Sequence, residues 1–327
     1  MLEMTHFYST KGYIMKLQIR RQIEVQSDNQ KIYQVISDLR QWNTWSPWYH
    51  MEPSSKIENS GVSGQIGQWQ TWEGQAIGSG KMTIIGLQEN QSIQIQLEFL
   101  KPFKSRAIVE FIISRKGQNI CEVEWRMDSS LPFFMFFFKK MMVAMMSRDF
   151  DRGLLMLKEF TETGAVCAKS EYLGEVHMPE LNLIGVKNSC TLNQLSQSMS
   201  RDFQNLFQNL NSPDLPEKIG ALCITHRFDI VKNECEYTAA MMFPVGQVLN
   251  SPAGFVNLSY PSHVAISAHH QGAYRHLGNT WGMVMSMFRS LKLKNNKSVP
   301  MYEIYLNNPQ QTAEKDLLTQ VVSPIKK

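Results

Sequence analysis

The stretch that decides the fold of the second half of the chain is residues 300–309, Pro-Met-Tyr-Glu-Ile-Tyr-Leu-Asn-Asn-Pro. Aromatic and β-branched residues between an entry proline and an Asn-Asn-Pro exit are typical of a β-strand. Side chains alternate between the two faces of a strand, so Tyr302, Ile304 and Leu306 share one face. Glu303 and Tyr305 share the other. The strand therefore predicts a carboxylate flanked by rings, which is either an exposed surface acid or part of a binding site.

The segments around this strand form an internal repeat. Each half shows the order strand, helix, strand, strand, first at 172–187, 192–210, 218–228 and 234–245, then at 255–270, 277–291, 300–307 and 316–325. A hydrophobic-proline step occurs in both first strands, and Pro179 and Pro261 are 82 residues apart. Such a duplication predicts a pseudo-twofold axis, with both helices on one sheet face and a ligand cleft on the other face. By the same offset, Glu303 corresponds to about Ala221.

The first half of the chain predicts a sheet that grips a long helix. Residues 16–25 alternate as a half-buried strand, and Ser27 and Gln30 form a capping box before a helical stripe. Glycine-broken strands follow up to residue 128, and residues 133–161 predict a long helix. Strands at hairpin spacing indicate an antiparallel sheet.

The predicted fold class is therefore α+β. An N-terminal helix-grip antiparallel sheet with a long C-terminal helix precedes a pseudo-twofold duplicated β-α-β-β domain. The predicted boundaries are an extension at 1–15, a first domain at 16–162, a linker at 163–171 and a second domain at 172–327.

Composition excludes several classes of function. A net charge of +4 is too small and too dispersed to indicate nucleic-acid binding. The five cysteines contain no C-x-x-C pair, so we expect neither a metal site nor disulfides, and the expected compartment is the reducing cytoplasm. Residues 1–16 do not have the pattern of a signal peptide and are either an extension or lie before a start at Met15. We expect no cofactor.

The most apolar run, residues 131–146, carries Lys139 and Lys140 at its centre. It is too short and too charged for a transmembrane helix. We interpret it as a buried or cavity-covering helix and expect no membrane partner.

The motifs WNTWSPW, GQIGQWQTWEGQAIGSGKM, LEFLKPFKSRA, VEWRM and DFDRGLLMLKEF resemble the SRPBCC (polyketide cyclase/START-like) superfamily over residues 16–162. The resemblance implies an apolar ligand cavity between the sheet and the long helix. Trp69 and Trp72 are candidate walls of that cavity, and the alternative for each is ordinary core packing.

The motifs YPSHVAISAHHQGAYRHLGNTWGMVMSMF, PMYEIYLNNP and DLLTQVVSPI resemble GyrI-like domains, the effector-binding domains of AraC- and MerR-type multidrug regulators. The resemblance implies that Glu303 recognises cationic aromatic ligands, with Tyr305 and Trp281 as walls. Tyr274 belongs to the same motif, and Tyr237 is a candidate wall from the first repeat. His270 is expected to be a structural hydrogen-bonding residue. Thr319-Gln320 departs from the threonine-glutamate that the family usually shows.

We interpret the chain as a two-domain protein that binds small lipophilic molecules, cationic and aromatic ones in the second domain, as a sensor or a sequestering protein in transcription regulation. No helix-turn-helix precedes either domain, so we expect no direct contact with nucleic acid. One alternative is a hydrolase of strained electrophiles that uses Glu303 and Tyr305. Another is an interaction protein like the DNA gyrase inhibitors of the GyrI-like family, with a protein partner.

Overall fold

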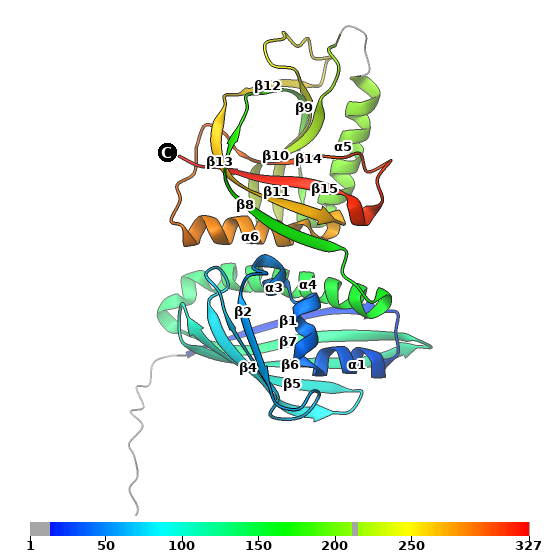
Figure 1. Cartoon of the computed structure of the whole chain (residues 1–327), viewed down its shortest axis with the longest axis vertical. Coiled ribbons are helices and arrows are strands. Elements are labelled where there is room, and N and C mark those ends of the chain that lie inside the picture. Colours follow the sequence, from blue (N-terminus) through cyan, green and yellow to red (C-terminus); the bar gives the residue numbers. More distant parts are fainter. Residues whose placement is uncertain (1–13, 211–214, 327) are drawn as a thin grey trace, which may run out of the picture.

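The computed structural model describes residues 14–210 and 215–326, and it describes only the backbone of Ile14 and of residues 131–135. Two domains are stacked end to end, each built on its own antiparallel sheet (Figure 1). The chain passes from one domain to the other directly after α4 (Lys139–Thr163), which ends at Gly164 in a left-handed conformation. The α+β class and the two predicted architectures are confirmed.

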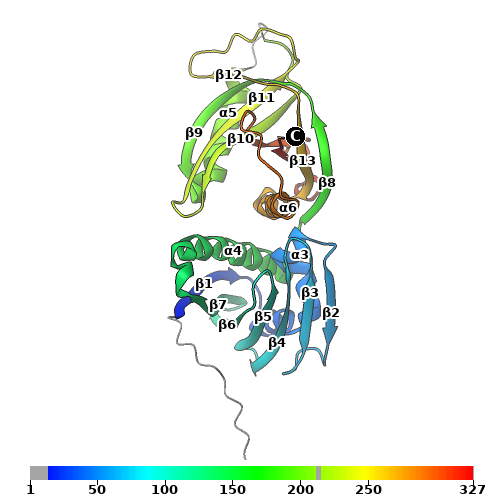
Figure 2. The ribbon, with the colours of Figure 1, turned by 90° about the vertical axis from the view of Figure 1, so that its left-hand side faces the viewer.

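The N-terminal domain is a seven-stranded sheet in the order β1-β7-β6-β5-β4-β3-β2. Helix α4 covers one face of this sheet and lies between it and the C-terminal domain (Figures 1 and 2). The elements before α4 are β1 (Ile14–Val25), α1 (Asn29–Ser37), η1 (Leu39–Gln41), α2 (Trp42–Trp45), α3 (Pro47–Met51), β2 (Lys56–Ser60), β3 (Trp69–Glu73), β4 (Ser79–Gln88), β5 (Ser92–Lys101), β6 (Ser105–Gly117), β7 (Ile120–Pro132) and η2 (Phe133–Phe138).

Tryptophans form the centre of the N-terminal core. Trp125 of β7 stacks on Phe150 of α4, with ring centroids 4.2 Å apart. Trp45 of α2 and Trp48 of α3 meet the Trp125 ring edge-on, with ring centroids 6.0 and 5.9 Å from it. This ring cluster joins the helix to the sheet, since Trp125 and Phe150 are both almost fully buried.

Two local predictions for this domain are wrong. Asp28, not Ser27, caps α1, because its carboxylate accepts the Lys31 N–H at 2.8 Å. The prediction of one buried or cavity-covering helix over 131–146 is wrong in part: within the described residues 136–146, Phe137 is 77% exposed and Met141 43%, whereas Met142, Val143 and Met146 pack against the core. The run begins with the last two residues of β7, continues as the 3-10 helix η2 and becomes α-helical only at Lys139.

The C-terminal domain is an eight-stranded sheet in the order β12-β9-β11-β10-β14-β15-β13-β8. If each strand is replaced by its equivalent in the other repeat, the same order results, read in the opposite direction. The pseudo-twofold axis therefore passes between the two central strands, β10 and β14. The elements are β8 (Ala168–Met178), β9 (Leu181–Thr191), η3 (Leu192–Gln194), α5 (Leu195–Asn209), β10 (Gly220–Asp229), β11 (Glu234–Phe243), β12 (Val256–Tyr260), β13 (His263–Gly272), η4 (Tyr274–His276), α6 (Leu277–Ser290), β14 (Met301–Tyr305), η5 (Glu314–Asp316) and β15 (Leu318–Pro324).

The first strand of each repeat is two strands rather than one. The strand is interrupted between Met178 and Leu181 in the first repeat and between Tyr260 and His263 in the second, at the two proline steps. Proline lacks the N–H that a continuous ladder needs. The two parts of the interrupted strand pair with different neighbours. In the first repeat, β8 pairs with β13, whereas β9 pairs with β11 and β12. Strand β8 also begins at Ala168, inside the predicted linker.

The register at the axis agrees with the predicted counterpart of Glu303. In the β10–β14 pair, Glu303 lies directly opposite Cys223, whereas Ala221 lies opposite Tyr305. A shift of 82 residues maps each of these two pairs onto the other, so the offset extends to this pair of strands and Ala221 is the equivalent of Glu303. The strand that carries the acid is paired with a strand that has alanine at the equivalent position and a thiol directly opposite the acid.

The face of the sheet that carries Glu303 is different from the predicted one. Tyr305 packs with α5 through Phe203, and Trp281 of α6 reaches Glu303, so the acid lies on the face that carries the helices. The opposite face is filled by a core cluster that includes Tyr302 and Ile304 together with residues of β8, β9, β10, β13 and β15. The prediction of a cleft on the helix-free face is wrong.

Gly272 at the end of β13 requires glycine for two reasons. Its φ is +120°, and an added Cβ would lie 2.2 Å from the Cys167 carbonyl oxygen. That oxygen is fixed because it accepts the Ala273 N–H at 2.9 Å.

We expect Gly272→Ala to lower the free energy of unfolding by more than about 2 kcal/mol, because backbone strain and the steric clash add. Gly246 is the matched control, since its φ is +81° and no atom lies within 4 Å of an added Cβ. Gly246→Ala should cost only the left-handed strain, about 1 kcal/mol. Urea denaturation of both variants measures the difference, and equal losses would contradict the steric argument.

Candidate functional site

The candidate site is a cluster of one acid and three rings, which we call the acid–aromatic cluster: Glu303, Tyr305, Trp281 and Tyr274. The Glu303 carboxylate accepts hydrogen bonds from the indole N–H of Trp281 and, at 3.0 Å, from the hydroxyl of Tyr305. Three elements supply these groups, since β14 carries the acid and one ring, α6 the indole and η4 Tyr274. All four side chains keep partial exposure, and Tyr274 is 36% exposed.

The rings pack edge to face around the acid. Tyr305 meets Tyr274 with ring centroids 5.6 Å apart and an interplanar angle of 70°. On its other side it meets Phe203 of α5 at 5.5 Å and 87°. The cluster is therefore bounded by both repeats, although its single charge belongs to the second one.

The electrostatics of Glu303 are set by burial and by two neutral donors. Burial raises the pKa of the Glu303 carboxyl, and the hydrogen bonds from Trp281 and Tyr305 offset part of that rise. Burial next to this acid raises the pKa of Tyr274 to about 12 and holds that of Tyr305 well above its usual value. Both phenols are thus neutral hydrogen-bond donors at physiological pH.

Two predicted residues lie outside the cluster. Tyr237 is fully buried, and its hydroxyl donates to Asp202 of α5 at 2.7 Å, which ties the helix to β11. His270 is also fully buried, between Thr280 Oγ1 and the Ala273 carbonyl oxygen, each at 3.0 Å. A carbonyl can only accept, so Nε2 carries the proton and Nδ1 accepts from Thr280. The structure places His270 in a structural role, as the sequence interpretation favoured.

A second candidate site is an apolar cavity of about 120 Å³ in the N-terminal domain. Trp72 lines it, together with Trp42, Trp48, Trp125, Phe99, Phe150 and Met146 among others. Trp69 does not, because it is on the other face of β3, where the Lys81 ammonium lies 4.7 Å from its ring centroid. Of the two predicted walls, only Trp72 is in a position to touch a ligand there.

Phe203 and Cys223 are neighbours of the cluster that the sequence alone did not predict. Phe203 was visible only as one member of the helical stripe of α5, which is the ordinary pattern of a core-facing helix. Cys223 became a neighbour of Glu303 only through the register of β10 and β14. No signal in a single sequence distinguishes either residue from core packing.

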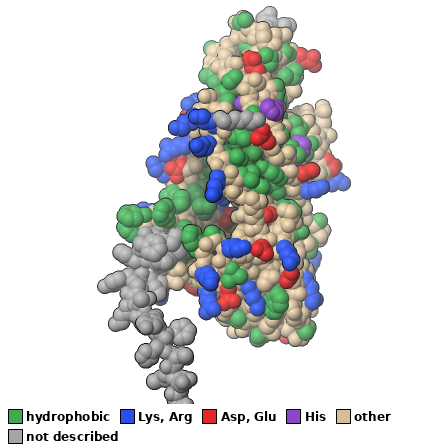
Figure 3. Space-filling view, turned by 60° about the vertical axis from the view of Figure 1, so that its left-hand side comes forward, with side chains coloured by type: hydrophobic (Ala, Val, Ile, Leu, Met, Phe, Trp, Pro, Cys, Tyr) green, Lys and Arg blue, Asp and Glu red, His purple; other side chains and the backbone are tan. Residues whose placement is uncertain are grey.

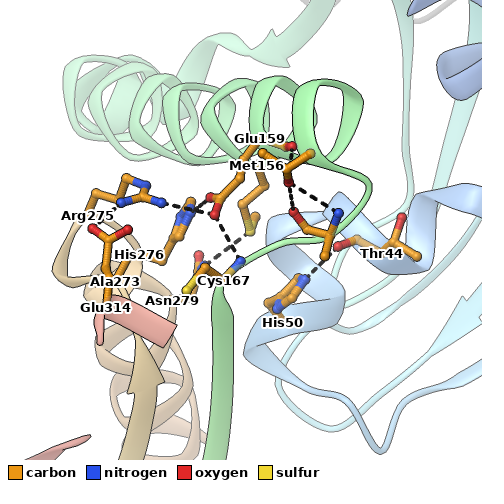
Figure 4. Close-up of polar contacts among 12 residues, drawn as sticks. Thr44, His50, Met156, Glu159, Cys167, Ala273, Arg275, His276, Asn279 and Glu314 are labelled. Carbon is orange, nitrogen blue, oxygen red and sulfur yellow. Dashed lines mark hydrogen bonds and ion pairs between the residues drawn. The ribbon is translucent and has the colours of Figure 1, made fainter. Parts of the chain in front are cut away.

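The domain interface reaches the cluster through α6 and η4. Glu159 of α4 accepts hydrogen bonds from His276, from Arg275 at 2.9 Å and from the Cys167 N–H at 3.1 Å (Figure 4). Burial opposes its ionisation, but these hydrogen bonds lower the pKa of Glu159 overall. Tyr274 of the cluster directly precedes the two residues that bind Glu159.

Helix α6 approaches the first domain closely because glycines, which have no side chain, lie on the side of the helix that faces that domain. An added Cβ on Gly282 would lie 2.6 Å from the Met51 sulfur of α3. One turn earlier, the Gly278 carbonyl accepts a hydrogen bond from Arg152 of α4. The helix that carries Trp281 is therefore held between its own sheet and the N-terminal domain.

The buried histidines predict acid sensitivity. Burial lowers the pKa of His270 to about 4, and it also lowers the pKa of His50 and His276 near the interface. The folded protein then binds fewer protons than the unfolded chain below about pH 6.5, so its stability falls as the pH drops towards 4.

For His270 alone the loss between pH 7.5 and 5.0 is about 2 kcal/mol, taken from about 1.4 kcal/mol per pH unit below 6.5. Urea denaturation at pH 7.5, 6.0 and 5.0 measures it, and His270→Gln should flatten the profile. A stability that does not change over this range would contradict the account.

The described residues hold no group of three or more histidine, cysteine or acidic side chains that could bind a metal ion. In the same part of the chain, no helix has both the length and the apolar character needed to cross a membrane.

The fold and the two sites define a chain that combines two small-molecule binding domains. Residues 16–162 match the family described as polyketide cyclase / dehydrase and lipid transport, and residues 175–326 match the GyrI-like small molecule binding domain. The first half of the chain is thus a polyketide cyclase/SRPBCC domain, and the second is a GyrI-like domain.

Solved structures resemble one domain or the other. SAV2435 bound to tetraphenylphosphonium has 19% sequence identity and a TM-score of 0.36, over 48% of this chain and 94% of that one. EcmrR in a complex with DNA has 12% identity and a TM-score of 0.41, over 59% and 72%. Norcoclaurine synthase from Thalictrum flavum with dopamine and hydroxybenzaldehyde has 13% identity and a TM-score of 0.37, over 50% and 96%. No curated protein matches the sequence.

Proposed function

We propose that the GyrI-like domain binds lipophilic cations with aromatic groups at the acid–aromatic cluster, as a sensor or sequestering protein of the multidrug-binding kind that acts in the cytoplasm. The observation that carries the proposal is the Glu303 carboxylate. Among the described residues, the groups that shift its pKa besides burial are the two neutral donors, and none is a lysine or arginine. A partly buried carboxylate without a cationic partner is unfavourable, and a bound cation would supply the missing charge.

The rings favour the same class of ligand. Tyr305, Tyr274 and Trp281 present aromatic surface beside the acid, and aromatic faces attract cations by about 0.5–2 kcal/mol each. Rings also bury apolar groups of the ligand without demanding one exact shape. Charge and hydrophobic area together select a lipophilic cation over a metal ion or a sugar.

The test is calorimetric titration of the full chain with tetraphenylphosphonium and with the neutral triphenylphosphine oxide. We expect the cation to bind at least about tenfold more tightly, because one charge interaction in a half-buried site exceeds about 1.4 kcal/mol. Equal affinities, or no binding of the cation, would overturn the proposal.

The contact between Tyr305 and Glu303 supports a second candidate function. A carboxylate with a raised pKa can act as a general base on water that attacks a ring carbon. The strained C–C bond breaks, its electron pair passes to the activating carbonyl group, and the tyrosine hydroxyl can donate a proton to that carbonyl oxygen. This hydrolase would open strained electrophilic rings. Its test is turnover of a panel of activated cyclopropanes, which Tyr305→Phe should abolish while cation binding persists. No turnover of any of them would leave binding as the function of the site.

For the N-terminal domain we propose an apolar ligand. The cavity lining is almost entirely aromatic and aliphatic, with Gln70, Asn43 and Ser46 as its few polar members apart from a tyrosine and the indoles. A cavity of about 120 Å³ fits a small ring or a short alkyl segment.

A further inference from the structure

Exposed apolar side chains gather at one end of the N-terminal domain. Leu100 and Phe103 are 52% and 75% exposed, Phe136, Phe137 and Phe138 are 44%, 77% and 53% exposed, and Met141 is 43% exposed. We call these six residues the aromatic rim. Single exposed apolar residues are normal on a protein surface, but a contiguous group of this kind marks an interaction site.

The strand register brings the two segments of the rim together. Phe99 of β5 is opposite Ser105 of β6, and Ala107 of β6 is opposite Ser129 of β7. The β5–β6 hairpin turn therefore lies beside the end of β7, from which η2 continues. Figure 3 shows hydrophobic side chains gathered at this edge of the molecule.

Basic residues surround the rim. Lys104 lies in the hairpin, Lys139 and Lys140 begin α4, and Lys16 lies in β1 opposite Ser130 of β7. The acids at this end are already paired, Glu73 with Lys101 at 3.2 Å and Glu98 with Arg106 at 2.9 Å. The end of the domain thus combines protruding rings with an excess of positive charge.

The rim also adjoins the apolar cavity. Phe99 lines the cavity, and Leu100 is the next residue along the same strand on its outer side. Met146 lines the cavity from α4, about one turn beyond Met141. An apolar molecule bound at the rim would therefore be close to the residues that form the cavity wall.

We propose that the aromatic rim docks on the surface of an anionic lipid bilayer, where it gives the N-terminal cavity access to lipophilic molecules dissolved in the membrane. Reversible membrane binding generally needs two signals, an apolar insertion and a basic patch, and the rim has both. The charges also argue against a second copy of the same basic surface as the occupant, because like charges repel.

This inference revises the expectation that the protein has no membrane partner. The sequence interpretation took residues 131–146 as a buried or cavity-covering helix, whereas about half of the described residues 136–146 are exposed. The rim lies on a membrane rather than across it, in agreement with the short 3-10 segment that carries three of its rings.

The test is co-sedimentation of the full chain with vesicles. We expect binding to vesicles of phosphatidylcholine with one quarter phosphatidylglycerol, and at least tenfold weaker binding to pure phosphatidylcholine. The double variant Phe103→Ser/Phe137→Ser removes the two most exposed rings, and Lys139→Glu/Lys140→Glu reverses two charges. Each double variant should weaken binding by roughly tenfold or more. The phenylalanine variant loses apolar area that would be buried in the bilayer. The lysine variant loses two charges that each contribute about fivefold near an anionic surface.

The control is Ile66→Ser/Val248→Ser, which removes two side chains of 64% and 87% exposure outside the rim and should leave vesicle binding unchanged. Far-UV circular dichroism verifies that each variant is folded. Failure of the wild-type chain to bind anionic vesicles at low salt would overturn the proposal. So would a dimer in solution that Phe103→Ser/Phe137→Ser dissociates, because the rim would then be an interface between copies.

Discussion

Replacing Glu303 by glutamine is expected to reduce the affinity for tetraphenylphosphonium by about 30-fold or more. The amide keeps the shape of the side chain and can still accept a hydrogen bond from Trp281, but it carries no charge. Truncating one partner of a buried charge interaction costs about 2–5 kcal/mol of binding free energy. The neutral triphenylphosphine oxide should bind both proteins equally.

The stability of Glu303→Gln separates this loss from unfolding. Burial raises the pKa of Glu303 in the folded chain, so its ionised form destabilises the fold above the pKa of the unfolded state. Removing that charge should leave the free energy of unfolding unchanged or higher. Glu180→Gln, an exposed acid of the same domain, is the control and should bind the cation like the wild type. Parallel loss of binding and of stability in Glu303→Gln would contradict the account.

Replacing Trp125 by alanine is expected to destabilise the N-terminal domain by about 3–5 kcal/mol. The indole is 2% exposed, stacks on Phe150 and meets the rings of Trp42, Trp45 and Trp48. It also forms part of the cavity wall, so the variant enlarges the cavity as well as losing these contacts.

Trp69→Ala is the matched control for this prediction. Its ring is half-exposed and contacts the Lys81 ammonium, an interaction worth about 0.5–1 kcal/mol at an exposed site. Guanidinium denaturation followed by far-UV circular dichroism measures both variants. A loss from Trp125→Ala no larger than that from Trp69→Ala would mean that the ring cluster does not hold α4 to the sheet.

Strand alternation and the internal repeat were enough to predict much of the C-terminal domain. The alternation in residues 301–305 correctly separated Glu303 and Tyr305 from the buried Tyr302 and Ile304. These are local properties of a backbone with a two-residue period, so they are readable without tertiary structure. The grouping of Trp281 with Glu303 followed from the family resemblance, and the structure brings the two together, while their role in ligand binding stays a prediction.

Features that depend on long-range pairing could not be predicted. The face of the sheet that carries the helices, and the pairing of Glu303 with Cys223, depend on how β10 meets β14. The contact of Glu159 with His276 depends on how two separately folded domains dock. The sequence also predicted one buried or cavity-covering helix over residues 131–146. A hydrophobic run does not reveal which of its side chains pack against the core and which are exposed.

The measurement that tests the central claim most directly is the proton balance of cation binding. Calorimetric titration with tetraphenylphosphonium, in buffers of different ionisation enthalpy between pH 4.5 and 7.5, counts the protons released. A bound cation lowers the raised pKa of Glu303, so the wild-type chain should release protons in the pH range where that carboxyl titrates, and Glu303→Gln should release none. Binding by the wild type without proton release, or the same release from Glu303→Gln, would contradict the assignment of Glu303 as the partner of the cation.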